Sequence, residues 1–145
     1  MRHLSLITGV LLGGGLALAG CAQPNSVKTF HATLSSLQEV PTVKSMGTGE
    51  ADLTLDTATD VLTYKLVIKN LSSPVVAAHI HGPAMPGANA GVLIPFSTAD
   101  APITGMAALT PDEVADLKAG RYYINVHTMN NKGGEIRGQI QPYGK

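Results

Sequence analysis

Residues 48–70 read TGEADLTLDTATDVLTYKLVIKN, and the order of apolar and polar residues in this segment is the strongest structural signal in the chain. Apolar and polar residues alternate in Thr48–Leu55 and again in Val61–Asn70. A period of two residues is typical of a strand that buries one face and exposes the other. The polar segment Asp56–Asp60 between the two halves is short enough for a turn, so we predict an antiparallel β-hairpin.

Alternation of the same kind recurs on both sides of this hairpin. The further predicted strands are a first strand around Phe30–Leu34, then Val76–His81, Arg121–His127 and Glu135–Gln141, with weaker candidates at Val92–Phe96 and Ile103–Leu109. The segments Gly82–Gly91 and Asn130–Gly134 are rich in glycine, proline and asparagine, and they predict a long loop and a tight turn.

One helix is expected between Pro111 and Ala119. Thr110 and Glu113 have the spacing of a capping box, and Gly120 suits the left-handed residue that ends a helix. Together these elements predict an all-β fold, a Greek-key-like antiparallel β-sandwich of seven or eight short strands with one short helix.

The composition excludes several classes of protein. The chain has 145 residues, no formal net charge and only 14% charged residues, so it carries no basic surface for nucleic acid. A single cysteine excludes an internal disulfide framework and a zinc site built from cysteines. The sequence also lacks a Gly-x-Ser-x-Gly motif, a phosphate-binding glycine loop and a His-Glu-x-x-His helix, so we do not expect an enzyme of those classes.

The N-terminus has the features of an export signal. A basic start is followed by the apolar run Leu4–Ala19, which is shorter than the roughly 20 residues of a membrane span. The sequence Leu18-Ala19-Gly20-Cys21 closely resembles the lipobox of bacterial lipoproteins. An ordinary signal followed by a free or disulfide-seeking cysteine remains the alternative.

The lipobox resemblance implies a domain organisation and a location. Residues 1–20 would be a signal peptide, and residues 21–28 a tether lipidated at Cys21 with a diacylglycerol and an amide-linked acyl chain such as palmitate. Residues 29–142 would form the folded domain at the cell envelope, anchored to a membrane through the lipid. In Gram-negative lipoproteins, Ala22 rather than Asp after the cysteine favours the outer membrane, so the domain would face the periplasm or the cell surface.

Several segments of the domain together resemble the CHRD domain, first described in chordin. The segments that carry the resemblance are Gln38–Pro41, Ala77–Ala84, Tyr123–Thr128 and Gly134–Ile140, with glycines at 47, 49, 91, 105 and 120. The resemblance covers about Phe30–Gln141 and implies an all-β sandwich. It implies no settled activity for bacterial members, and we do not transfer chordin's role in binding bone morphogenetic proteins.

Three histidines carry the main chemical hypothesis. His79 and His81 are two residues apart on one strand and therefore point to the same side, and His127 lies on the polar face of another strand. If these strands are neighbours, the three imidazoles converge and could bind copper or zinc with a coordination position left open. His31, on the polar side of the first strand, is a fourth candidate ligand.

Other polar residues could support such a site. Asn125 or Glu135 could orient an imidazole through a hydrogen bond. Glu39 could be a ligand or a loop clamp, but a solvated or capping carboxylate is the simpler expectation. For Glu135 and Arg137, which share one face of a strand, surface ion pairs with a neighbouring strand are the simplest expectation.

Two hypotheses lead, and an enzyme whose substrate the sequence does not identify is a third, weaker alternative. The first is a non-enzymatic binding or structural module that meets an envelope protein or glycan, with histidines that only hydrogen-bond loop carbonyls and fix the Gly82–Gly91 loop. The second is a copper- or zinc-binding protein that uses His79, His81 and His127. The His-x-His strand is similar to one in copper-zinc superoxide dismutases, but the chain lacks a second ligand cluster with an aspartate, so dismutase activity is not expected.

Overall fold

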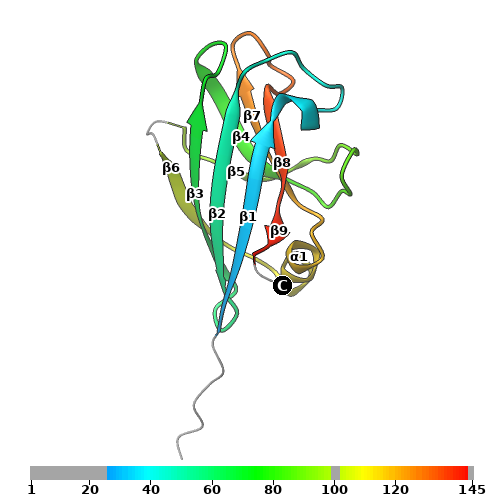
Figure 1. The fold of residues 1–145 in the computed structure, drawn as a ribbon. Helices are drawn as coiled ribbons and strands as arrows, with labels where there is room; N and C mark the ends of the chain where they lie inside the picture. The colour runs from blue at the N-terminus through cyan, green and yellow to red at the C-terminus, as the bar shows by residue number, and fades with distance from the viewer. Residues whose placement is uncertain (1–25, 99–101, 144–145) are drawn as a thin grey trace, which may run out of the picture.

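The computed structural model describes residues 26–98 and 102–143. Within these residues, eight strands form one antiparallel sheet in the order β5-β4-β7-β8-β1-β2-β3-β6, and the short strand β9 pairs with β1. The sheet curls around a common interior (Figure 1). The elements are β1 (Val27–Ser35), the 3-10 turn η1 (Ser36–Gln38), β2 (Thr48–Asp56), β3 (Val61–Lys69), β4 (Val75–His81), β5 (Val92–Pro95), β6 (Ile103–Ala108), α1 (Pro111–Lys118), β7 (Tyr123–Thr128), β8 (Ile136–Gln139) and β9 (Gln141–Pro142).

The hairpin predicted from residues 48–70 is confirmed. Strands β2 and β3 pair in continuous register from Thr48 opposite Lys69 to Asp56 opposite Val61. In the turn, the Asp56 side chain accepts a hydrogen bond from the Ala58 amide (2.8 Å), and Asp60 adopts a positive φ of 54°. The all-β antiparallel fold with one short helix is therefore confirmed.

The helix and the strand ends differ from the prediction by one or a few residues. Helix α1 has the predicted capping box between Thr110 and Glu113, but it ends at Lys118 rather than Ala119. The expected strand Glu135–Gln141 is divided into β8, which pairs with β7 and β1, and β9, which pairs with β1.

The predicted signal peptide and Cys21 lie outside the described residues. The predicted tether reaches into them only at its end, where Val27 and Lys28 are already paired in β1 with Asp56 and Leu55 of β2. Among the described residues, no helix combines the length and the hydropathy that a bilayer crossing requires.

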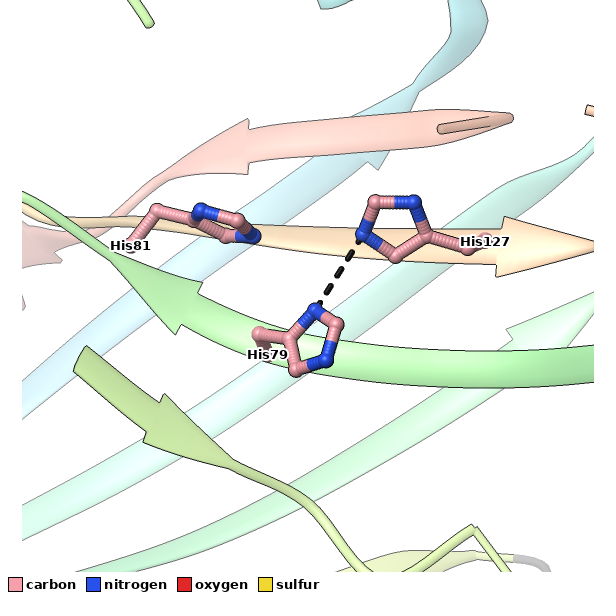
Figure 2. Close-up of side chains that lie close together, drawn as sticks. All are labelled: His79, His81 and His127. Carbon is pink, nitrogen blue, oxygen red and sulfur yellow. Dashed lines mark hydrogen bonds between the residues drawn. The ribbon is translucent and has the colours of Figure 1, made fainter. Parts of the chain in front are cut away.

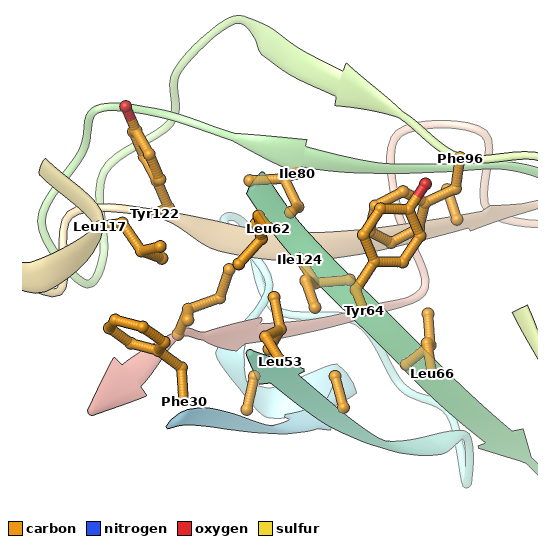
Figure 3. Packing of buried hydrophobic residues seen from close by; sticks show 14 of the residues in the cluster. Phe30, Leu53, Leu62, Tyr64, Leu66, Ile80, Phe96, Leu117, Tyr122 and Ile124 are labelled. Carbon is orange, nitrogen blue, oxygen red and sulfur yellow. The ribbon is translucent and has the colours of Figure 1, made fainter. Parts of the chain in front are cut away.

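The core fills the interior of the curled sheet and is built mainly from aliphatic side chains (Figure 3). The leucines at 34, 53, 55, 62 and 66 are at most 1% exposed, as the alternation in β1, β2 and β3 requires. Tyr64 and Phe96 stack with their ring centroids 4.2 Å apart. Each fully buried leucine contributes about 1.5–3 kcal/mol of transfer free energy, so this interior provides most of the driving force for folding.

Strand β7 is buried on both of its faces. Ile124 and Val126 point into the core, while Tyr123 and Asn125 on the outer face are also almost completely covered, at 2% and 6% exposed. The cover consists of the Gly82–Gly91 loop, whose Ala90 amide donates to the Tyr123 hydroxyl (3.0 Å), and of the segment after η1, which brings Glu39 to Asn125. This second buried layer contains the polar residues discussed next.

Candidate metal centre

Strands β4 and β7 are adjacent, so the three histidines do converge. Each of His79, His81 and His127 offers one ring nitrogen, and these nitrogens all lie within 4.8 Å of one another. The closest pair is His79 Nδ1 and His127 Nε2 at 3.2 Å (Figure 2). The sequence could predict the shared side of His79 and His81, and the pairing of β4 with β7 adds His127.

Two backbone carbonyls determine which nitrogens of the cluster carry protons. His81 Nδ1 lies 3.0 Å from the Ala90 carbonyl oxygen, and His127 Nδ1 lies 2.9 Å from that of Lys132. A carbonyl only accepts, so in each neutral imidazole Nδ1 donates its proton and Nε2 is the acceptor nitrogen. His127 Nε2 accepts from His79 Nδ1, so this hydrogen bond must open before both atoms can bind an ion. The Nε2 atom of His81 is buried and has no hydrogen-bond partner among the described residues.

The cluster favours neutral imidazoles. Burial lowers the pKa of His79 and of His81, and the positive charge that His127 would carry when protonated lowers both pKa values further. Neutral imidazole is the form that binds a metal ion, so at neutral pH these rings need to release few protons before they bind one.

The spacing of the nitrogens is close to that of a mononuclear site. Two imidazole nitrogens on one tetrahedral ion are about 3.3 Å apart and can never be more than about 4.1 Å apart. The 3.2 Å between His79 Nδ1 and His127 Nε2 matches the tetrahedral spacing. The largest separation within the cluster, at most 4.8 Å, can exceed the limit of about 4.1 Å. Bringing all three nitrogens to the tetrahedral spacing therefore requires the rings to approach one another by up to about 1.5 Å.

His31 is not brought to this cluster. On β1, its Nδ1 lies 3.0 Å from Asp52 Oδ1 and its Nε2 lies 2.7 Å from Glu50 Oε2. Strand β8 separates β1 from β7 in the sheet, so the ring faces acidic side chains of β2 instead.

None of the three predicted supporting residues hydrogen-bonds a histidine in the described part of the chain. The Asn125 amide donates to both carboxylate oxygens of Glu39, at 3.1 and 3.0 Å. Burial raises the pKa of Glu39 to about 7, although the Asn125 hydrogen bond and the Arg137 charge favour the carboxylate. Glu39 thus clamps the segment after η1 onto β7, and the simpler expectation of a solvated carboxylate is wrong because the side chain is buried. The backbone carbonyls orient the imidazoles.

Glu135 anchors a separate network. It is fully buried and accepts hydrogen bonds from Ser45 Oγ (2.5 Å), Ser72 N and Oγ (both 2.7 Å), Thr128 Oγ1 (2.6 Å) and Asn131 Nδ2 (3.2 Å). Burial alone would raise the pKa of Glu135, but these donors outweigh it and lower the pKa to about 2.

The expectation that Glu135 and Arg137 form surface ion pairs with a neighbouring strand is wrong, because both side chains are buried. Arg137 is only 2% exposed, and its terminal nitrogens donate to Asn89 Oδ1 (3.0 Å) and the Ala88 carbonyl (2.7 Å). The prediction failed because the Gly82–Gly91 loop covers the outer face of β8, which alternation alone would leave in solvent.

Tyr123 also borders the cluster, although no role was predicted for it. The His81 and Tyr123 rings are nearly parallel, 6° apart with centroids at 5.0 Å, and Arg137 Cζ lies 3.5 Å from the Tyr123 centroid. Since β7 lies between β4 and β8, Tyr123 separates the histidine from the guanidinium. Its position two residues before Asn125, on the same polar face of the strand, could have predicted that Tyr123 lies near the site. The carbonyls of Ala90 and Lys132 belong to the backbone, so residue types could not predict their role.

Residues 30–140 match the family model of the CHRD domain. No curated protein and no solved structure matches the chain. The matched residues include the three clustered histidines, the Glu39 clamp and the Glu135 network.

Proposed function

This chain belongs to the CHRD domain family, and on that premise we propose that its domain is a binding module of the cell envelope whose ligand is a copper or zinc ion held by His79, His81 and His127. The observation that carries the proposal is the convergence of three ring nitrogens within 4.8 Å. The family membership supports a binding or structural module, and the cluster gives that module a ligand.

The hydrogen bonds to the cluster favour metal binding. The carbonyls of Ala90 and Lys132 hold His81 and His127 in the tautomer that presents Nε2. Such outer partners commonly fix the ring orientation and raise the basicity of a metal-ligating histidine. A buried Nε2 without a partner is unfavourable in the free protein, and a bound ion would satisfy it.

Imidazole donors restrict the class of ion. Nitrogen ligands suit zinc and copper, whereas calcium and magnesium require oxygen ligands. Three protein ligands leave one position of a tetrahedral ion for water or another small ligand. The proposal assigns ion binding and no reaction.

The proposed location rests on the N-terminal sequence. An apolar segment followed by Leu18-Ala19-Gly20-Cys21 supports export, cleavage before Cys21 and lipidation of its thiol. Several acyl chains together hold a protein stably on a membrane. Mass spectrometry of the membrane fraction tests this, since a diacylglycerol and an acyl group should be found on Cys21 and be absent from Cys21→Ser. An unmodified Cys21 in the mature protein would contradict the anchor.

A second candidate function is the purely structural module that meets an envelope protein or glycan. The observation in its favour is that His81 and His127 each hydrogen-bond a loop carbonyl, which alone could account for both residues. The two candidates differ at His79, whose ring bonds no backbone group in the described residues and contacts the His127 ring instead.

Elemental analysis separates the two candidates. The full-length Cys21→Ser protein would be purified without chelators or a His tag, beside His79→Ala and His31→Ala. We expect near-stoichiometric copper or zinc in the parent and in His31→Ala. Metal binding in His79→Ala should be at least about tenfold weaker, because even the loss of a residue that only hydrogen-bonds a metal ligand weakens binding by that factor. All three should remain folded by circular dichroism. Absence of metal from the parent, with no uptake on titration, would contradict the metal function and leave the structural candidate.

A further inference from the structure

A second site is formed on the outer side of β8, where the segment after η1 faces the Gly82–Gly91 loop. It is a hollow of about 300 Å³ whose lining includes Leu37, Glu39, Val40, Pro86 and Arg137. None of the three clustered histidines lines it. We call it the Arg137 hollow.

The charge of Arg137 has no direct counterion. Its terminal nitrogens donate to two neutral oxygens, and no carboxylate of the described residues lies within ion-pairing distance. A buried charge is unfavourable unless it is paired, and stacking on Tyr123 offsets only part of that penalty. A guanidinium has more N–H donors than these two contacts use, so Arg137 can still donate to a ligand.

Glu39 is the other ionisable residue of the hollow. Its carboxyl group accepts both hydrogen bonds from Asn125 and does not reach Arg137 to form an ion pair. Since burial raises its pKa to about 7, a large share of Glu39 is neutral near pH 7. Arg137 keeps its charge at any such pH, so the hollow carries a net positive charge, and protonated Glu39 can donate a hydrogen bond.

Part of the lining of the hollow is apolar. Leu37, the middle residue of η1, is 78% exposed and lines the hollow together with Val40 and Pro86, beside the polar Gln38. An exposed leucine alone is ordinary, but here the apolar side chains border a buried cation. A ligand that matches this arrangement has an anionic end and a short hydrocarbon body.

We propose that the Arg137 hollow binds a small organic carboxylate, with the carboxylate at the Arg137 guanidinium and the hydrocarbon body against Leu37 and Pro86. Arg is well suited to carboxylate recognition because its planar donors match the two oxygens. The site uses none of the proposed metal ligands, so the proposal holds whether or not the histidines bind an ion.

The test uses three probes of four carbon atoms each: butyrate, butan-1-ol and butylammonium. Each is titrated into the full-length Cys21→Ser protein while NMR follows the Arg137 side-chain N–H and the Gly87 amide. Butyrate should shift both signals in a saturable manner, and butan-1-ol should bind at least about tenfold more weakly because it lacks the charge-assisted hydrogen bonds. An equal response to butan-1-ol, a stronger response to butylammonium, or no response to butyrate would overturn the proposal.

Variants locate the binding. Arg137→Met should abolish the butyrate response, but it also removes the contacts to the Gly82–Gly91 loop. Glu39→Gln therefore serves as a second variant, because it removes the competing negative charge and keeps a side chain of the same size beside Asn125. It should bind butyrate more tightly than the parent at pH 8, and weaker binding would overturn the proposal.

A matched pair of exposed residues tests the apolar contact. Leu37→Ala should weaken the binding of butyrate more than that of acetate, whereas Met106→Ala should change neither. Met106 is 72% exposed on β6 and is therefore a suitable control for Leu37. Equal effects of both variants on butyrate would overturn the placement of the hydrocarbon chain.

Discussion

Replacing Glu135 by glutamine should lower the free energy of unfolding by about 3 kcal/mol at pH 7. This loss of unfolding free energy follows from the pKa of Glu135, which the surrounding donors lower from 4.5 to about 2. Each pH unit of such a difference corresponds to about 1.4 kcal/mol, which favours the folded state with an ionised carboxylate.

The geometry explains why glutamine cannot substitute. One carboxylate oxygen accepts from the Ser72 amide and the other from the Asn131 side-chain amide. The Ser72 amide can only donate, so a glutamine must place its oxygen there, and its NH2 group then faces the NH2 group of Asn131. Turning the Asn131 amide would relieve this contact but would remove its hydrogen bond to Ser72 Oγ. Two donors pointing at each other inside the protein leave at least one buried polar group unsatisfied.

Urea unfolding at several pH values provides the assay. A lowered pKa means that the carboxylate stabilises the parent fully above pH 4.5 and that this contribution declines as the pH falls toward about 2. The Glu135→Gln variant should lack that part of the pH dependence. Glu50→Gln, at a side chain that is 57% exposed, is the matched control and should change stability by less than about 1 kcal/mol. A Glu135→Gln protein within about 1 kcal/mol of the parent at pH 7 would refute this reasoning.

Three further predictions concern packing, capping and the ion. Gly138→Ala should destabilise the fold by about 1–3 kcal/mol, because the new Cβ would lie 2.5 Å from the Thr33 carbonyl oxygen. Gly133→Ala is the control and should be nearly neutral, because no atom lies within 4 Å of its new Cβ. Equal urea midpoints of the two variants would contradict the predicted difference. Thr110→Ala should cost about 1 kcal/mol by removing the capping box of α1, measured by the same unfolding assay; an unchanged midpoint would exclude that role. Zinc at about 100 times its dissociation constant should stabilise the parent and His31→Ala by about 2.7 kcal/mol, and a chelator should reverse this effect. Thermal scans in which zinc does not raise the melting temperature would argue against a site in the folded state.

The fold could be predicted from the sequence to the extent that burial follows a simple period. Residues 48–70 bury one face of each strand, so their alternation identified the β2–β3 hairpin. The capping residues around α1 act locally, and they also appear in the structure as predicted. The alternation of apolar and polar residues alone could not predict the pairing of β4 with β7, because that pairing depends on contacts between segments distant in the sequence.

The same limitation explains the residues that the sequence misplaced. Arg137 and Glu135 sit at outward positions of an alternating segment, but loops cover that side and bury both side chains. Alternation reports which side of the sheet a residue occupies and contains no information about what covers that side. The carbonyls that orient His81 and His127 belong to the backbone, so residue types could not reveal them.

Binding of one transition-metal ion by His79, His81 and His127 can be examined by X-ray absorption at the metal edge of the zinc- or copper-loaded full-length Cys21→Ser protein, because the spectrum reports the ligands around the ion. We expect imidazole nitrogens at about 2.0–2.1 Å with the scattering of about three rings, and a clear loss of that signal in His79→Ala. A spectrum of oxygen ligands alone, or one identical in His79→Ala, would contradict it.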